Sequence, residues 1–333
     1  MKRPERPSVR NSRRTDFPGR TIRTENGREG RTEYRITSEW DGQSLKAFLR
    51  AQGYSTGAMT VLKKREDGLL VNGTHATVRC LLRSGDLLTV AEEDREAKDT
   101  LVPVPMALDI LYEGDEYLVI NKPPRMPTHP SHGHREDTLA NGLAARFAER
   151  GIPFVFRACS RLDRDTSGAV PVAKTQRAAC RFAQAHRAGL VEKRYLAVLE
   201  GTLPEREGVI ELPIRREEDS VIRRVTAPDG APSRTEYRVI GERRAEDGTV
   251  LTLVSACPVT GRTHQLRVHF AAVGAPILGD FLYGRESDRI GRQALHAARI
   301  AFPGTDGTRI TAEAPVPEDL DRLVRWIGET DTD

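Results

Sequence analysis

The chain has 333 residues, of which 38% are hydrophobic and 30% are charged, and its formal net charge is +4. This length allows two or three compact units, and the composition is typical of a soluble globular protein. No stretch approaches the roughly 20 apolar residues of a membrane helix, and the first residues lack the apolar core of a secretory signal. The four cysteines form no C-x-x-C pair, so we expect isolated thiols in a reducing cytoplasm rather than a disulfide scaffold.

The basic residues are concentrated at the N-terminus. Residues 1–30 carry nine Lys or Arg and four acidic side chains, so the other 303 residues have a slightly negative net charge. Residues 1–32 contain too few apolar side chains to form a core and are predicted to be a disordered basic tail. A flexible arginine-rich arm suits contact with phosphates, although a solvated tail without a partner explains the charge equally well.

Residues 33–92 have the pattern of a small α+β unit. One helix is expected around Leu45, Phe48 and Leu49 before Gly53, and a second from Ser55 to about Lys64. Strands and one tight turn are expected at the following positions: 69–71, Asn72-Gly73, 76–79 and 87–90.

This order of elements resembles the S-four-type RNA-binding module, first known from a protein of the small ribosomal subunit. The resemblance implies that a helix end carrying Lys63, Lys64 and Arg65 lies against RNA phosphates. Any small α+β unit with a solvated basic helix end would show a similar pattern. Residues 93–107 are charged and then proline-rich, so they are predicted to be a linker.

A larger unit is expected from residue 108 to 326, with an acidic tail at 327–333. Its strands are predicted at 117–120, 169–173, 195–199, 233–240, 251–258 and 310–314, and its helices at 139–149, 176–188 and 264–273. Many strands interleaved with few helices predict an α+β fold with a mixed, largely antiparallel central sheet and flanking helices. Pro171 would be awkward inside a central strand.

A run of polar residues, S-R-L-D-R-D-T-S-G at 160–168, lies between two apolar segments. A buried aspartate is costly unless it is paired, and arginine is its natural partner. Taken alone, the run is predicted to be a salt-bridged turn in front of a strand.

Motifs on both sides of this run change that interpretation. In chain order they are N-K-P-P at 121–124, P-T-H-P at 127–130, K-R-Y at 193–195, T-G-R-T-H-Q-L-R at 260–267, P-I-L-G-D at 276–280, Y-G at 283–284 and L-H-A at 295–297. Together they resemble the RluA-type pseudouridine synthases over about residues 108–325. The resemblance implies the pseudouridine synthase fold and isomerisation of uridines in structured RNA, with large-subunit ribosomal RNA favoured over transfer RNA.

The resemblance also assigns roles to single residues. Asp163 matches the catalytic carboxylate, Arg262 the arginine paired with it, and Tyr195 the aromatic residue over the target base. Contacts with RNA are expected from Arg161, Lys122, His129, His264 and Arg267. Ser160 stands where many relatives have His, which puts only a local hydrogen bond or RNA contact in doubt.

The chemistry explains these residue types. Pseudouridine formation breaks the bond from the ribose carbon to the base nitrogen and rejoins the ribose to a base carbon, so neither a cofactor nor a metal is needed. Asp163 must be ionised to attack the ribose or to assist elimination to a glycal, and a nearby arginine keeps it charged and oriented. Tyr195 could stack on the uracil and take part in the final proton transfer. The target base must first leave its helical stack.

The sequence also allows three other interpretations. His129, His132 and His134 lie close together, but a flexible loop gives them no defined ligand geometry, so no metal site is predicted. A glycoside or nucleoside hydrolase would need a second carboxylate, for which Asp165 is the only close candidate. A non-catalytic RNA-binding or ribosome-assembly factor is the third, although such a protein would not need Asp163 facing a phosphate-rich ligand. The protein is expected to be a cytoplasmic monomer.

Overall fold

The structure is a computed structural model that describes residues 31–54, 56–91, 101–304 and 307–328. The predicted tail at residues 1–30 and most of the predicted linker therefore lie outside the described residues. The chain divides into two compact units, Met1–Ala51 with Met59–Ala91 and Gln52–Ala58 with Glu92–Asp333. Among the described residues, no helix is both long and apolar enough to cross a membrane.

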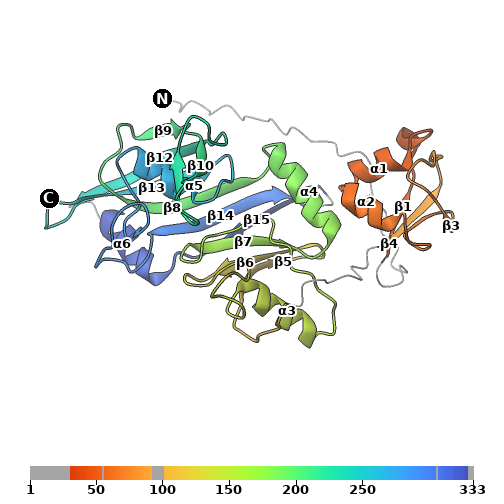
Figure 1. Ribbon diagram of the computed structural model, residues 1–333, viewed down its shortest axis with the longest axis horizontal. Helices are drawn as coiled ribbons and strands as arrows, with labels where there is room; N and C mark the ends of the chain where they lie inside the picture. The colour runs from red at the N-terminus through yellow and green to blue at the C-terminus, as the bar shows by residue number, and fades with distance from the viewer. Residues whose placement is uncertain (1–30, 55, 92–100, 305–306, 329–333) are drawn as a thin grey trace, which may run out of the picture. The chain divides into compact units, whose positions relative to one another are not determined.

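The small unit contains a four-stranded antiparallel sheet of order β1-β4-β2-β3 and two short helices (Figure 1). Its elements are β1 (Arg31–Arg35), η1 (Ser38–Trp40), α1 (Leu45–Ala51), α2 (Thr56–Leu62), β2 (Leu69–Val71), β3 (Thr74–His75) and β4 (Leu87–Ala91). Phe48 of α1 packs edge-on against the rings of Tyr34 and Trp40, at centroid distances of 5.3 and 5.2 Å. These rings anchor the first helix to the sheet.

Both predicted helices of this unit and the strands at 69–71 and 87–90 are confirmed, but the strand predicted at 76–79 is wrong. Asn72 and Gly73 have φ values of 51° and 81°, the backbone of a two-residue hairpin turn. This turn brings Thr74 directly opposite Val71, so β3 is Thr74–His75. β1 begins at Arg31, which lies inside the stretch predicted to be a tail.

The large unit is built on a nine-stranded sheet of order β5-β6-β7-β14-β8-β13-β12-β9, with β15 beside β14. Its elements are β5 (Asp109–Glu113), β6 (Tyr117–Lys122), α3 (Leu139–Glu149), β7 (Ser167–Ala173), α4 (Gln176–Arg187), β8 (Glu192–Glu200), β9 (Glu207–Ile210), β10 (Ile214–Arg216), β11 (Arg224–Thr226), β12 (Thr235–Arg244), β13 (Val250–Pro258), α5 (Gln265–Ala272), β14 (Leu295–Pro303), β15 (Arg309–Glu313) and α6 (Glu318–Gly328). Among the described strands of this sheet, only the β7–β14 pairing is parallel, which confirms the predicted mixed, largely antiparallel sheet with flanking helices.

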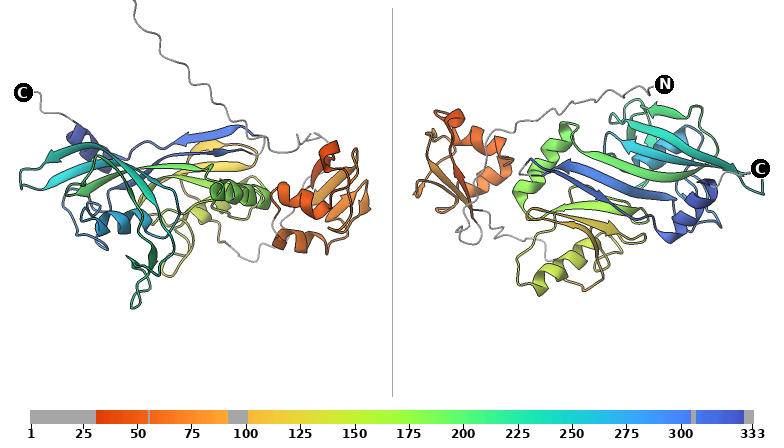
Figure 2. Two further views of the ribbon diagram at one scale, coloured as in Figure 1. Left: turned by 90° about the horizontal axis from the view of Figure 1, so that it is seen from above. Right: turned by 180° about the vertical axis from the view of Figure 1, so that it is seen from behind.

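Helices cover both faces of this sheet, and β6 shows how. Successive side chains of a strand point to opposite faces. Leu118 and Ile120 belong to the core cluster that includes side chains of α3, α5 and α6. Tyr117 and Val119 belong to a second cluster that includes Phe182 of α4. Figure 2 shows α5 and the separate β10–β11 hairpin on one side of the sheet.

Pro171 lies inside β7 without disrupting the sheet. β7 pairs with β14 only at Ser167 and Gly168. Beyond Gly168, the edge of β7 that faces away from β6 is therefore not paired with β14. There the Pro171 carbonyl accepts a hydrogen bond from the backbone N–H of Cys159 at 2.8 Å. The N–H and C=O of one strand residue point to the same edge, so the missing N–H of Pro171 costs β7 no bond to β6.

Candidate active site

The turn that carries Asp163 is held by hydrogen bonds from side chains and backbone. The Thr128 hydroxyl donates to the carbonyl of Leu162 at 2.9 Å. The backbone N–H of Thr166 donates to the carbonyl of Asp163 at 3.1 Å, which closes the turn. The backbone of Asp163 is therefore fixed on both sides while its carboxylate points into a cleft.

Lys122 contributes to this turn rather than to an RNA surface. Its side chain is completely buried at the end of β6, and Nζ donates to the carbonyls of Pro123, Met126 and Arg164 at 2.9, 2.8 and 2.9 Å. Burial lowers the pKa of Lys122 to about 7, but three carbonyls match the three N–H bonds of the charged form. The predicted RNA contact of Lys122 is wrong, because no part of this side chain reaches the surface.

Gly168, the last residue of the polar run, lets the turn continue into β7 against β14. Its φ is +114°, and an added Cβ would lie 2.3 Å from the carbonyl oxygen of Ala297. Only glycine fits there. The neighbouring Ser167 hydroxyl lies 2.9 Å from Nδ1 of the buried His296, whose Nε2 lies 3.1 Å from the carbonyl of Ala314. These contacts explain the T-S-G and L-H-A motifs as structural support for the turn.

The arginine that pairs with Asp163 is Arg267, not Arg262. Nη1 of Arg267 donates to Oδ2 of Asp163 at 3.1 Å. The same guanidinium makes two further bonds, at 2.6 and 2.8 Å, to the fully buried carboxylate of Asp280. Arg262 is exposed, and its Nε donates to the carbonyl of Pro232 at 3.2 Å. The prediction that Arg262 pairs with Asp163 is therefore wrong. Arg267 lines the cleft although its side chain is only 5% exposed, so its expected RNA contact stays a prediction.

The position at which α5 begins explains why Arg267, and not Arg262, reaches Asp163. His264 precedes the helix with a left-handed φ of 58°, so Arg262 lies outside it and Arg267 is on its first turn. His264 Nδ1 lies 2.8 Å from the hydroxyl of Tyr283, and Nε2 lies 3.8 Å from Oδ1 of Asp163. Burial lowers the pKa of His264, opposed by the nearby Asp163 carboxylate. The Tyr283 ring also lies under the Arg267 guanidinium, 5.1 Å from it.

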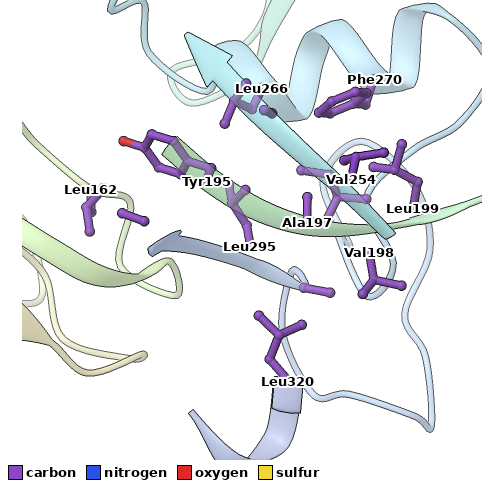
Figure 3. Close-up of a cluster of buried hydrophobic side chains, with 14 of the residues drawn as sticks. Leu162, Tyr195, Ala197, Val198, Leu199, Val254, Leu266, Phe270, Leu295 and Leu320 are labelled. Carbon is purple, nitrogen blue, oxygen red and sulfur yellow. The ribbon is translucent and has the colours of Figure 1, made fainter. Parts of the chain in front are cut away.

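Tyr195 forms the apolar wall of the cleft. It lies on β8 with 9% of its surface exposed, and Figure 3 shows it beside Leu162, Leu266 and Leu295. Burial, with a smaller effect of the Asp163 charge, raises the pKa of the Tyr195 hydroxyl. The hydroxyl is therefore protonated at neutral pH. A flat ring next to a fixed carboxylate suits a planar heterocycle.

The cleft has a volume of about 760 Å³ and a strongly basic lining. Its charged lining residues are Arg161, Asp163, Arg187, Lys193, Arg262 and Arg267. Asp163 is the only carboxylate among them, so the cleft attracts anions. Of the residues expected to touch RNA, Arg161 and His264 line the cleft, whereas His129 lies half-buried outside its lining, with its ring 4.9 Å from that of Phe156.

Several residues that shape this site have no role predicted from the sequence. Asp280, Tyr283 and Thr128 all lie in recognised motifs, but their partners come from elsewhere in the chain. A signal was present for Asp280, because a carboxylate at the end of the apolar run P-I-L-G-D needs a buried cation. In the small unit, Lys63 and Lys64 are exposed directly after α2, and Arg65 pairs with Asp67 at 3.1 Å.

The structure offers little support to the alternative chemistries. Asp165 pairs with Arg164 at 2.9 Å and does not line the cleft, so a paired-carboxylate hydrolase lacks its second group there. Nδ1 of His134 lies 2.6 Å from the Asp137 carboxylate. In the part of the chain that the structure describes, no group of three or more His, Cys, Asp or Glu residues could hold a metal ion.

Comparisons with known proteins identify one family. A family model described as RNA pseudouridylate synthase matches residues 116–272. The chain is 38% identical to the uncharacterized RNA pseudouridine synthase YjbO of Bacillus subtilis, over 85% of this chain and 98% of that protein. It is 36% identical to the ribosomal large subunit pseudouridine synthase D of Xanthomonas campestris, over 83% and 86%.

A solved structure shows the same relationship. The human RNA pseudouridylate synthase domain containing 1 superposes with a TM-score of 0.52 and 31% identity, covering 67% of this chain and 96% of the human chain. The match to this chain covers most of the length of both sequence relatives, and their names agree with the matched family. The chain therefore belongs to the RNA pseudouridine synthase family of enzymes.

Proposed function

We propose that the protein isomerises specific uridines in structured RNA and that Asp163 is the carboxylate that acts on the ribose. The observation that carries this proposal is the bond from Arg267 to Asp163 at 3.1 Å, inside the basic cleft and beside Tyr195. Asp280 locks the guanidinium from the other side, so Arg267 holds Asp163 in one orientation. A pre-oriented nucleophile lowers the entropic part of the barrier.

The reaction balances without an external group. The bond from the ribose C1′ to N1 of uracil breaks, the base turns, and C1′ joins C5, while C5 loses a proton and N1 gains one. Asp163 stabilises or covalently holds the ribose during this exchange. The Tyr195 ring stacks on the base, and its protonated hydroxyl can relay the proton that leaves C5.

We infer that the substrate is large-subunit ribosomal RNA. The relative from Xanthomonas campestris is named for the large ribosomal subunit, which supports this choice over transfer RNA. The small unit, with its two helices and antiparallel sheet, resembles the S-four-type module and would add an RNA-binding surface at Lys63 and Lys64. Arg161 and Arg262, exposed at the cleft, would contact the RNA backbone directly.

The test compares cells that carry the wild-type chain with cells that carry Asp163→Asn. Pseudouridines in cellular RNA are mapped by a chemical adduct that stops reverse transcription. We expect at least one site, in large-subunit ribosomal RNA, to disappear in the mutant while the protein still binds RNA. Asp165→Asn, in the same turn but outside the cleft, is the matched control and should retain the site. Identical maps for wild type and Asp163→Asn would reject the enzymatic role and favour a non-catalytic RNA-binding factor.

The small unit is tested with the full chain carrying Lys63→Gln and Lys64→Gln. Each lost phosphate contact should flatten the dependence of log affinity on log salt by roughly 0.7–0.9. We therefore expect weaker RNA binding and a salt slope lower by about 1.5, measured by filter binding from 50 to 200 mM salt. Turnover at saturating RNA should persist. An unchanged slope would show that this helix end does not touch the RNA.

A further inference from the structure

A lysine and a histidine that line the cleft contact each other. Lys193 lies near the start of β8 and His186 near the end of α4, and Lys193 Nζ lies 2.9 Å from His186 Nε2. Both side chains line the cleft. No residue of the proposed catalytic group contacts this pair, so the role of Asp163 leaves it unexplained.

The local fold keeps this pair open to the cleft. The ladder between β8 and β13 ends at Tyr195 and Ala256, so Lys193 lies beyond the last paired residue of that edge. The chain then leaves the sheet at Pro258 and passes the pair at Gly261. An added Cβ at Gly261 would lie 3.8 Å from Lys193 Nζ and 3.9 Å from His186 Nε2. These are ordinary van der Waals distances, so the backbone at Gly261 passes close to both nitrogens without covering them with a side chain.

The pair has no anionic partner in the described part of the chain. Burial alone lowers the pKa of Lys193 to about 8. Burial lowers the pKa of His186, and the positive charges of Lys193 and Arg187 lower it further. The other charged groups that line this cleft are Arg161, Arg187, Arg262, Arg267 and Asp163, and Asp163 is already bound by Arg267. A half-buried cation among other cations is costly unless an anion joins it.

We propose that Lys193 and His186 form a subsite for one backbone phosphate next to the target nucleotide. This proposal rests on the proposed function and specifies how the substrate is held. Lys193 and Tyr195 are two residues apart on β8, so they face the same side with a separation of roughly 6.6 Å. A base stacked on Tyr195 would then have its own ribose-phosphate within reach of the pair, which would fix C1′ relative to Asp163.

The test uses the full chain and a fluorescein-labelled nonamer of oligouridylate, which requires no knowledge of the natural target. Binding is measured by fluorescence anisotropy for wild type, Lys193→Met, Lys193→Arg and His186→Gln. Arg244→Met, an exposed residue near the end of β12 and outside the cleft, is the control. A second probe carries neutral methylphosphonate linkages in place of the phosphodiesters.

We expect Lys193→Met to weaken binding of the charged probe about tenfold, as for loss of a charge-assisted hydrogen bond. His186→Gln should weaken it less, whereas Lys193→Arg and Arg244→Met should bind like wild type. On the methylphosphonate probe, wild type and Lys193→Met should bind equally. The same affinity ratio on both probes, or no loss on the charged probe, would overturn the phosphate subsite.

The pH dependence gives a second readout. Phosphate binds the protonated lysine, so affinity should fall as the pH rises through the pKa of Lys193, about 8. Between pH 7.0 and 8.5 we expect wild type to lose about threefold in affinity and Lys193→Arg to lose nothing. Pseudouridine formation by wild type is assayed in parallel. If wild type forms no pseudouridine but its RNA binding still depends on Lys193, the proposed catalysis is rejected and the subsite is kept. If wild type forms pseudouridine but its RNA binding does not depend on Lys193, only the subsite is rejected.

Discussion

Replacing Arg267 should cost both stability and turnover, whereas replacing Arg262 should cost neither stability nor chemistry. The Asp280 carboxylate is fully buried and receives two bonds from Arg267 and two from the backbone N–H groups of Leu282 and Tyr283, at 3.1 and 3.2 Å. Removing one partner of a buried ion pair costs about 3–5 kcal/mol. The two backbone donors remain, so we expect Arg267→Gln to lower the free energy of unfolding by about 3 kcal/mol.

Urea unfolding provides the measurement. The chain has two tryptophans, and Trp326 lies on α6 in the large unit, so a Trp40→Phe background lets fluorescence report on that unit alone. Arg262→Gln should change the free energy of unfolding by no more than about 0.5 kcal/mol, because its side chain is exposed. Turnover should fall about 100-fold in Arg267→Gln, since Asp163 loses its orientation, and stay within a few-fold in Arg262→Gln.

A double variant separates stability from activity. Arg267→Met with Asp280→Asn removes both charges, so the uncompensated carboxylate is gone and much of the lost stability should return. Turnover should stay low because Asp163 still lacks its arginine. The reasoning would be refuted if Arg262→Gln abolished turnover while Arg267→Gln remained stable and active.

Two further predictions concern single buried side chains. Lys122→Met should lower the free energy of unfolding by about 1–3 kcal/mol, because three carbonyls lose their donor, with no change in RNA affinity. Thermal unfolding and filter binding check this, and a selective loss of RNA affinity would contradict it. Tyr195→Phe keeps the stacking ring, so RNA affinity should persist while turnover falls about 100-fold. Single-turnover kinetics separates the two effects, and unchanged turnover would remove the hydroxyl from the proton relay.

The sequence patterns predicted local elements better than they predicted partners. The helices at α3 and α4 follow from three- and four-residue apolar spacing and are correct to within a residue. The same spacing is present in α6, where Leu320, Leu323 and Ile327 are buried, although no helix is predicted there. β14 is not among the predicted strands, because its sequence L-H-A-A-R-I-A-F-P shows no alternation; its side chains are buried or half-buried on both faces of the sheet, so it need not alternate.

The wrong assignment of Arg262 has a physical explanation. The motif T-G-R-T-H-Q-L-R offers two arginines five residues apart, and the sequence alone does not tell where the helix starts. The left-handed conformation at His264 decides this, since it places Arg267 on α5 and leaves Arg262 in the preceding loop. Asp280, which orients Arg267, comes from a segment that follows the helix. Such pairings between distant segments depend on the complete fold.

The central claim, that Asp163 isomerises uridine, is tested most directly by tritium release from RNA labelled at C5 of uridine. Joining C1′ to C5 expels the C5 hydrogen, so each turnover releases one label into water. The purified wild-type chain should release tritium from large-subunit ribosomal RNA, Asp165→Asn should do so as well, and Asp163→Asn should release none although it still binds the RNA. Release by Asp163→Asn at the wild-type rate would contradict the account.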